Sequence, residues 1–144
     1  MRRRNIGLFA VLAMLSLSGC ATMTEQGSQP APEPAMLALS GTVFYRERIM
    51  LPPGSEVVVR LEDVSRMDVA SELIAETRFV PDGGPPYEFV LHYDAGDIKP
   101  GLRYNLRASI VTAERLRFIS DYAIDPFASQ QPLEILVKSA AGDR

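Results

Sequence analysis

The sequence predicts an all-β fold, a sandwich of about seven strands with an immunoglobulin-like arrangement of two sheets. From Met36 onward, apolar side chains recur at every second position, which is the period of a half-buried strand. Turn-forming Pro and Gly residues separate the runs, and no run keeps a convincing helical period. The runs follow one another at spacings of roughly 10–15 residues, which is typical of a two-sheet sandwich.

The chain begins with a segment typical of secretion. Residues 1–5 are basic, and the apolar run 6–17 that follows is about a dozen residues long, too short to span a ~30 Å hydrocarbon core. This order predicts a signal peptide over residues 1–19. The sequence LSGC at 17–20 resembles a bacterial lipobox. We therefore expect cleavage between Gly19 and Cys20 and attachment of lipid to the Cys20 thiol.

Cys20 is the only cysteine of the chain, so no disulfide can form within it. Two or three acyl chains on one residue anchor a protein firmly, whereas a single chain binds a membrane only marginally. Ala21 follows the cysteine, where an aspartate would be typical of retention at the inner membrane. The sequence thus predicts a lipid anchor in the outer membrane, on its periplasmic side.

Residues 20–36 are expected to form a tether between the lipid and the domain. They contain Pro30, Pro32 and Pro34 among Gln, Ser and Glu, with few side chains to bury. The conformational entropy lost on ordering them would therefore not be offset by apolar burial. Without the three arginines of the signal peptide, the charge is 15 − 3 − 18 = −6. A net negative charge argues against a nucleic-acid partner.

The sandwich domain is predicted over residues 37–139, followed by a disordered tail at 140–144. Residues 52–54 and 99–101 each place Pro before Gly, as a type II turn requires. Residues 68–77 could begin a helix, but the period of two that continues to Phe79 favours a strand. The expected strands cover residues 37–45, 56–62, 73–79, 87–93, 102–110, 116–122 and 133–137.

The fifth and sixth strands are expected to form a hairpin. Placing Ile110 opposite Phe118, both facing the core, leaves residues 113–115 as a three-residue loop. The same register sets Arg107 opposite Asp121 and predicts an ion pair across the strands.

Groups for catalysis or metal binding are scarce, so we expect no enzyme, no metal site and no cofactor. His92 is the single histidine and falls at an outward position of its strand. No Gly-x-Ser-x-Gly motif is present, and a zinc site would need further His or Cys ligands. The aspartates at 94 and 97 are better explained as turn residues than as calcium ligands.

One segment combines charge with exposed apolar character. Residues Arg46, Arg48, Ile49, Met50 and Leu51 form a possible surface for a protein partner, because Arg and Met are favoured in interfaces. The alternative is a strand end with solvated charges and a tucked apolar triad. An edge strand could also pair with a strand of a partner.

Four stretches resemble the YbaY/YscW-like family of bacterial lipoproteins, which includes pilotin-like proteins of type III secretion. They are residues 41–54 (GTVFYRERIMLPPG), 59–65 (VRLEDVS), 86–89 (PYEF) and 116–121 (LRFISD). The resemblance implies a β-sandwich lipoprotein. Its secretion-system members carry secretin subunits to the outer membrane and help their assembly. It implies no catalytic residues.

The leading hypothesis is a periplasmic protein-interaction module that acts as a pilotin-like chaperone for an envelope protein such as a secretin. The alternative is an envelope domain that binds a glycan or a lipid, for which six aromatic residues could line a site. If the chain is a protein-interaction module, these side chains fill the core, with the tyrosine hydroxyls at its rim. They are Tyr45, Tyr87, Phe89, Tyr93, Tyr104 and Tyr122.

Overall fold

The computed structural model describes residues 35–140. The predicted signal peptide at 1–19, Cys20, the tether up to residue 34 and the last four residues lie outside the described residues. No helix in the described part of the chain has the length and apolar character needed to cross a membrane.

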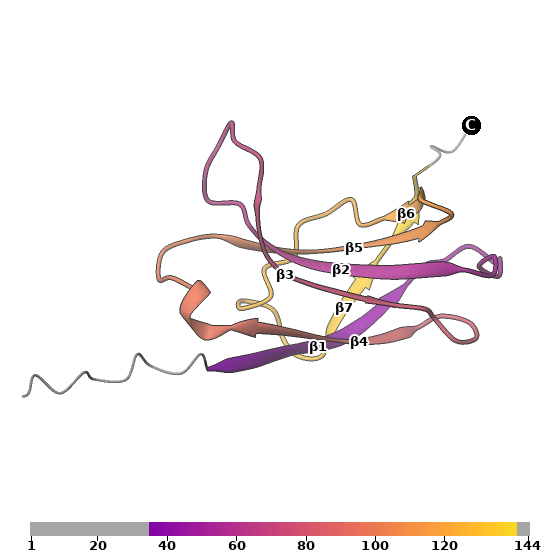
Figure 1. Cartoon of the computed structure of the whole chain (residues 1–144), viewed down its shortest axis with the longest axis horizontal. Helices are drawn as coiled ribbons and strands as arrows, with labels where there is room; N and C mark the ends of the chain where they lie inside the picture. The colour runs from indigo at the N-terminus through magenta and orange to yellow at the C-terminus, as the bar shows by residue number, and fades with distance from the viewer. Residues whose placement is uncertain (1–34, 141–144) are drawn as a thin grey trace, which may run out of the picture. The chain divides into compact units, whose positions relative to one another are not determined.

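The described residues form an all-β fold of two sheets, which confirms the predicted fold class (Figure 1). All seven expected strands are present, including the one that could have begun a helix. A two-residue strand at the end of the domain and a short 3₁₀ helix, η1, were not predicted. The elements are β1 (Met36–Phe44), β2 (Ser55–Asp63), β3 (Glu72–Phe79), β4 (Tyr87–Asp94), η1 (Ala95–Asp97), β5 (Tyr104–Thr112), β6 (Arg115–Ile119), β7 (Leu133–Leu136) and β8 (Lys138–Ser139).

One sheet has three strands in the order β4-β1-β7, and the other has five in the order β3-β2-β5-β6-β8. β1 pairs antiparallel with β4 and parallel with β7. The five-stranded sheet is antiparallel throughout. β1 and β2 follow each other in sequence but lie in different sheets, so the loop between them crosses from one layer to the other.

The period of two in the sequence becomes the inner face of each sheet. Along β4 buried and exposed residues alternate, and β5 buries every second residue from Tyr104 to Ile110. The core lies between the sheets, and its members come from both of them. Among its fully buried side chains are Leu61, Leu91, Leu106, Ile110, Leu133 and Ile135.

Several residues expected on the inner face are exposed instead. Leu37, Leu73, Leu102, Leu116 and Tyr122 all have a large accessible fraction. All five lie near or just beyond the end of a strand. Leu116 has a further reason, because the pairing of β5 with β6 shifts between Ile110 and Val111.

Both predicted Pro-Gly turns are confirmed. The amide of Ser55 donates to the carbonyl of Pro52 at 3.2 Å, with Gly54 at a φ of +77°. The amide of Leu102 donates to the carbonyl of Lys99 at 3.4 Å, with Gly101 at +80°. A positive φ at the third turn position is what glycine supplies without strain.

The β5–β6 hairpin has the predicted pairing of Ile110 with Phe118 but a different turn. Thr112 pairs with Arg115, so the loop consists of two residues, Ala113 and Glu114, both with positive φ. This is the backbone pattern of a type I′ turn, which fits the twist of a hairpin.

The predicted ion pair between Arg107 and Asp121 is wrong, because each has another partner. The Asp121 carboxylate accepts from the Lys138 ammonium of β8 at 2.7 Å, and the Arg107 guanidinium lies 3.9 Å from Glu62 of β2. β6 ends at Ile119, so Asp121 lies beyond the strand and faces β8.

The parallel pair β1–β7 depends on Gly41. It lies opposite Leu133, and a Cβ atom at position 41 would stand 2.1 Å from the Leu133 carbonyl oxygen. Only a residue without a side chain allows the two backbones to come this close.

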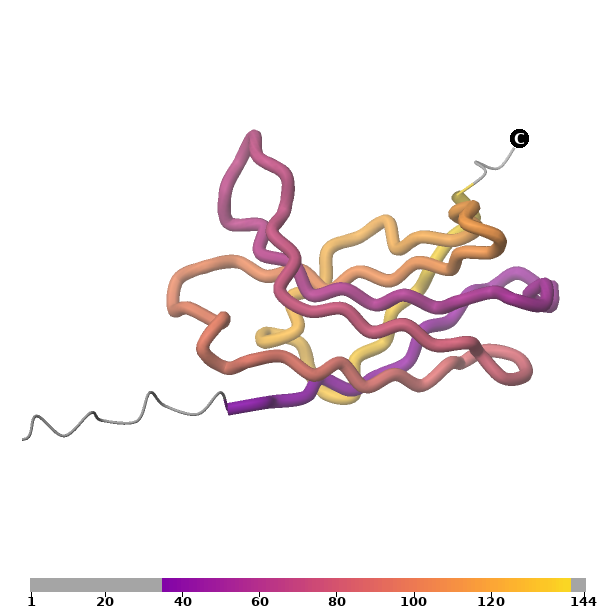
Figure 2. Tube along the Cα trace, in the orientation of Figure 1, coloured from indigo at the N-terminus to yellow at the C-terminus, as the bar shows by residue number. Residues whose placement is uncertain are grey.

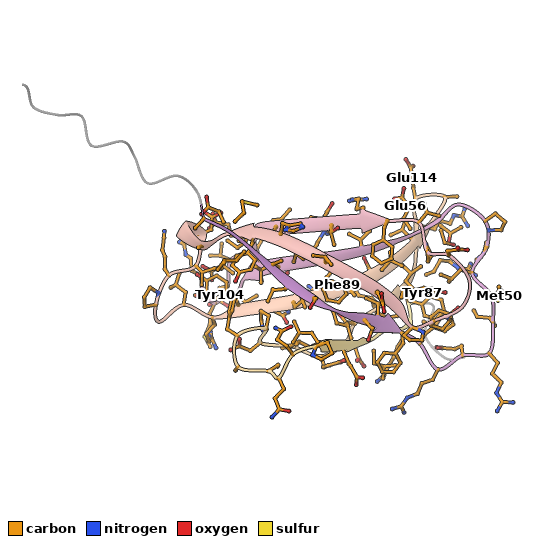
Figure 3. All side chains as sticks on the ribbon, turned by 90° about the horizontal axis from the view of Figure 1, so that it is seen from below. Met50, Glu56, Tyr87, Phe89, Tyr104 and Glu114 are labelled. Atoms are coloured by element: carbon orange, nitrogen blue, oxygen red, sulfur yellow. The ribbon has the colours of Figure 1, made fainter. Side chains whose placement is uncertain are left out.

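The loops divide between the two ends of the sandwich (Figure 2). The β1–β2, β3–β4 and β5–β6 connections lie at one end, which we call the loop end. The start of β1, the β2–β3 loop and the β4–β5 connection lie at the other, which we call the entry end. The labelled side chains show the same separation, with Met50 at the loop end and Tyr104 at the entry end (Figure 3).

Candidate functional site at the loop end

The β1–β2 loop is attached to the core by its first residue, Tyr45. The Tyr45 ring is buried, and its hydroxyl donates a 2.9 Å hydrogen bond to the carbonyl oxygen of Ile49. This bond folds residues 45–49 into a compact bend, while the exposed side chains of Arg46 and Arg48 point to solvent. The loop is therefore held by a core residue and not only by its two strands.

Two further aromatic residues surround Tyr45. Its hydroxyl lies 3.3 Å from the hydroxyl of Tyr87 on β4, and its ring stacks on Phe118 of β6 with a centroid distance of 4.8 Å. Burial, reinforced by the hydrogen bond with Tyr45, raises the pKa of Tyr87 well above its usual range. Tyr87 therefore stays protonated, and Tyr45, Tyr87 and Phe118 connect both sheets beneath the loop.

Exposed apolar side chains lie on the surface of the loop end, near Tyr45, Tyr87 and Phe118. Met50 is 73% exposed, Ile49 47% and Leu116 of β6 46%. A hollow of about 210 Å³ is lined by Ile49 of the loop together with Arg115, Leu116, Arg117, Phe118 and Ser139. A second hollow of about 180 Å³ is lined by Met50 and Leu51 with the following Pro-Pro-Gly turn and Val80, Pro81 and Gly83.

Of the five predicted surface residues, the three apolar ones line these two hollows, whereas the exposed Arg46 and Arg48 line neither. Ile49 lies toward β6, while Met50 and Leu51 lie toward the β3–β4 turn. Sequence reasoning missed Val80, which directly follows β3, and Arg115, Leu116 and Arg117 of β6. Leu116 was missed because it lies two positions before the buried Phe118, so a period of two predicts that it also faces the core.

The arginines at the loop end differ from those on the outer face of the five-stranded sheet. There, Arg60 and Arg78 both pair with Glu76, and Arg78 also lies 3.8 Å from Glu56. None of the ion pairs formed among residues 35–140 includes Arg46, Arg48, Arg115 or Arg117. The loop end therefore presents four arginines that form no ion pair within the described residues, next to the acidic residues Glu47 and Glu114.

The structure nominates no catalytic centre among the described residues. His92 is exposed on the outside of β4, as expected, and its side chain takes part in none of the ion pairs formed within residues 35–140. No group of three or more His, Cys, Asp or Glu side chains in this range could hold a metal ion. Asp94 instead accepts a 2.8 Å hydrogen bond from the amide of Gly96 and caps η1, which is the predicted turn role.

Five of the six aromatic residues that could have lined a ligand site are buried in the core. Tyr104 illustrates the expected rim position: its ring contacts Phe127 edge-on at 5.5 Å. Its hydroxyl accepts from the amide of Lys99 and donates to the carbonyl of Asp97. Tyr122 is the exception, because it is 41% exposed and bonds to the edge of β7.

Three comparisons with known proteins agree with this architecture. Residues 34–132 match the family described as type III secretion system lipoprotein chaperone (YscW). The chain is 31% identical over 129 residues to the uncharacterized lipoprotein YbaY of Escherichia coli, covering 81% of this chain and 67% of that protein.

A solved structure is also similar, an alternative pilotin from the type II secretion system of Vibrio cholerae. It superposes with a TM-score of 0.65 at 36% identity, covering 72% of this chain and 98% of the pilotin. The sequence match and the shared two-sheet fold lead to one conclusion: the chain belongs to the YscW family of lipoprotein chaperones.

Proposed function

We propose that this chain is an outer-membrane lipoprotein of the periplasmic face that acts as a pilotin-like chaperone for an envelope protein. In this account the signal peptide is removed between Gly19 and Cys20, and Cys20 carries the lipid. The tether of residues 20–36 joins the lipid to the sandwich. The family match and the similarity to an alternative pilotin support a role in binding rather than catalysis.

The observation that carries the proposal is the character of the loop end. Arginines that form no ion pair within the described residues and exposed apolar side chains both occur at this end, and Arg115 and Arg117 line one hollow with Ile49, Leu116 and Phe118. Arg and Met are enriched in protein interfaces, and apolar side chains beside charged ones are typical of an interface with a polar rim. The partner surface proposed is Arg46, Arg48, Ile49, Met50 and Leu51.

The position of this surface suits an anchored carrier. β1 runs from the entry end to the loop end over nine residues, which corresponds to about 30 Å at ~3.3 Å per residue. A protein attached through residues preceding β1 would therefore present the loop end away from its point of attachment.

The test compares the full-length wild type with Cys20→Ala in cells, since position 20 lies outside the described domain. Outer-membrane, inner-membrane and soluble periplasmic fractions are separated, and proteins crosslinked to the chain are identified in each. We expect the wild type and one dominant envelope partner in the outer-membrane fraction. Cys20→Ala should be absent from the outer-membrane fraction, and the partner should remain with it in another fraction. An unchanged location of both proteins in Cys20→Ala would contradict the anchored-carrier role.

A further inference from the structure

We infer that the hollow between Ile49 and β6 binds an apolar anchor side chain of an acidic segment of the partner protein, with its carboxylates on Arg115 and Arg117. The inference rests on the proposed function and specifies which chemistry the partner presents.

The shape of the hollow suits a side chain better than a free small molecule. Its volume of about 210 Å³ is below the ~300 Å³ at which small-molecule pockets begin. Ile49 supplies an apolar wall from the β1–β2 loop, and Leu116 and Phe118 supply apolar walls from β6. A hollow of this kind at an exposed surface is suited to one anchor residue of a protein partner.

The charge around the hollow selects an acidic partner. Residues 35–140 contain 11 basic and 15 acidic side chains, a net charge of 11 − 15 = −4. Yet Arg115 and Arg117 line the hollow on either side of Leu116, and no ion pair within the described residues includes them. A carboxylate from a partner would supply the missing counter-charge.

The walls are held in place before any partner binds. Phe118 stacks on Tyr45, whose hydroxyl holds the carbonyl of Ile49. On the other side, the amide of Ala140 donates to the carbonyl of Arg117 at 2.8 Å. A site whose backbone is already fixed loses little conformational entropy on binding.

A neighbouring hollow shows why the inference falls on this site. On the outer face of the five-stranded sheet a hollow of about 210 Å³ is also lined by Leu116, with Arg60, Glu62 and Arg107. Its arginines face carboxylates of their own sheet, Glu76 for Arg60 and Glu62 for Arg107. It offers no uncompensated charge, so the acidic segment is assigned to the hollow at Ile49.

The experiment places a photoreactive residue at Leu116 of the full-length lipidated chain, crosslinks in cells and sequences the attached partner peptide. The crosslink is repeated with Arg115→Glu and Arg117→Glu together. A matched double reversal, Arg66→Glu with Arg103→Glu, changes two exposed arginines at the entry end and serves as control. A photoreactive residue at Met50, in the second hollow, reports partner binding independently.

We expect the Leu116 adduct to be a segment that carries both acidic and apolar side chains. The double reversal at 115 and 117 should reduce its yield about tenfold, because attraction becomes repulsion at two positions. The entry-end reversal should leave the yield unchanged. A basic or uncharged segment crosslinked at Leu116 would overturn the inference. An unchanged crosslink yield in the Arg115→Glu, Arg117→Glu variant would also overturn it. Crosslinks at Met50 without any at Leu116 would refute only the inference, whereas loss of both would refute the proposed function.

Discussion

The hydroxyl of Tyr45 donates to the carbonyl oxygen of Ile49 at 2.9 Å, so a buried core residue holds an exposed residue of the loop that follows it. The same hydroxyl lies 3.3 Å from that of Tyr87 in the same sheet. The conformation of the β1–β2 loop is therefore coupled to the packing of the core. This coupling allows a loop rich in exposed side chains to keep one shape.

Tyr45→Phe should loosen the loop while keeping the ring stacked on Phe118. The Tyr87 hydroxyl loses its neighbour, and we expect the free energy of unfolding to fall by about 1–2 kcal/mol. Trypsin should cleave after Arg46 and Arg48 faster, because cleavage requires local opening of the loop. Cleavage after Arg66 in the β2–β3 loop is the internal control. Equal rates after Arg46 in both proteins would show that the hydroxyl does not hold the loop.

Gly41→Ala should destabilise the contact between β1 and β7. The added Cβ would meet the carbonyl oxygen of Leu133 at 2.1 Å, and a paired backbone cannot move aside without disturbing the sheet. We expect a loss of about 1–3 kcal/mol or more in urea unfolding. Gly84→Ala is the matched control, since a Cβ there meets nothing within 4 Å, and it should change stability by no more than ~0.5 kcal/mol. Equal losses in the two variants would refute the close approach.

Glu76→Gln should reduce the dependence of stability on acid. Hydrogen bonding to Arg78, followed by Arg60, lowers the pKa of Glu76 in the folded protein. A carboxyl with a depressed folded pKa stabilises the fold above its unfolded pKa and loses this contribution as the pH falls through the folded value. Unfolding measured at pH 7 and again near pH 3 should show a less stable variant at pH 7 and a smaller difference at the lower pH. A difference that does not change with pH would contradict the ion pairs.

Tyr122→Phe should expose the edge of β7. The Tyr122 hydroxyl accepts from the amide of Leu136 at 2.8 Å and donates to the carbonyl of Glu134 at 3.3 Å. Unpaired groups on an edge strand can pair with another chain. We expect a stability loss of about 1 kcal/mol and greater self-association with concentration in sedimentation velocity. A variant with the sedimentation behaviour and stability of the wild type would argue against this role.

The sequence predicts the strands well and the site only in part. Alternation such as that from Tyr87 to Tyr93 reports directly which side chains face the core, so element types and most of the core follow from it. The order of strands does not follow, because the pairing of β1 with both β4 and β7 depends on contacts remote in sequence.

The surface shows the same limit. Ile49 and Met50 could be selected because charge and apolar character meet within one short segment. Arg115 and Arg117 could not, since their importance depends on their position beside Ile49 in space and on the absence of a carboxylate partner within residues 35–140. The shifted pairing of β5 with β6, which leaves Leu116 exposed, also has no signal in a simple period of two.

The most direct measurement of the central claim compares two methionines of the full-length chain. Met50 is 73% exposed at the loop end and Met67 is 78% exposed in the β2–β3 loop at the entry end, so they match in residue type and accessibility. A photoreactive residue is placed at each position in turn, and envelope proteins crosslinked in cells are identified. The account predicts one dominant envelope partner from position 50 and little from position 67. The same partner and yield from both positions, or a partner from position 67 alone, would contradict it.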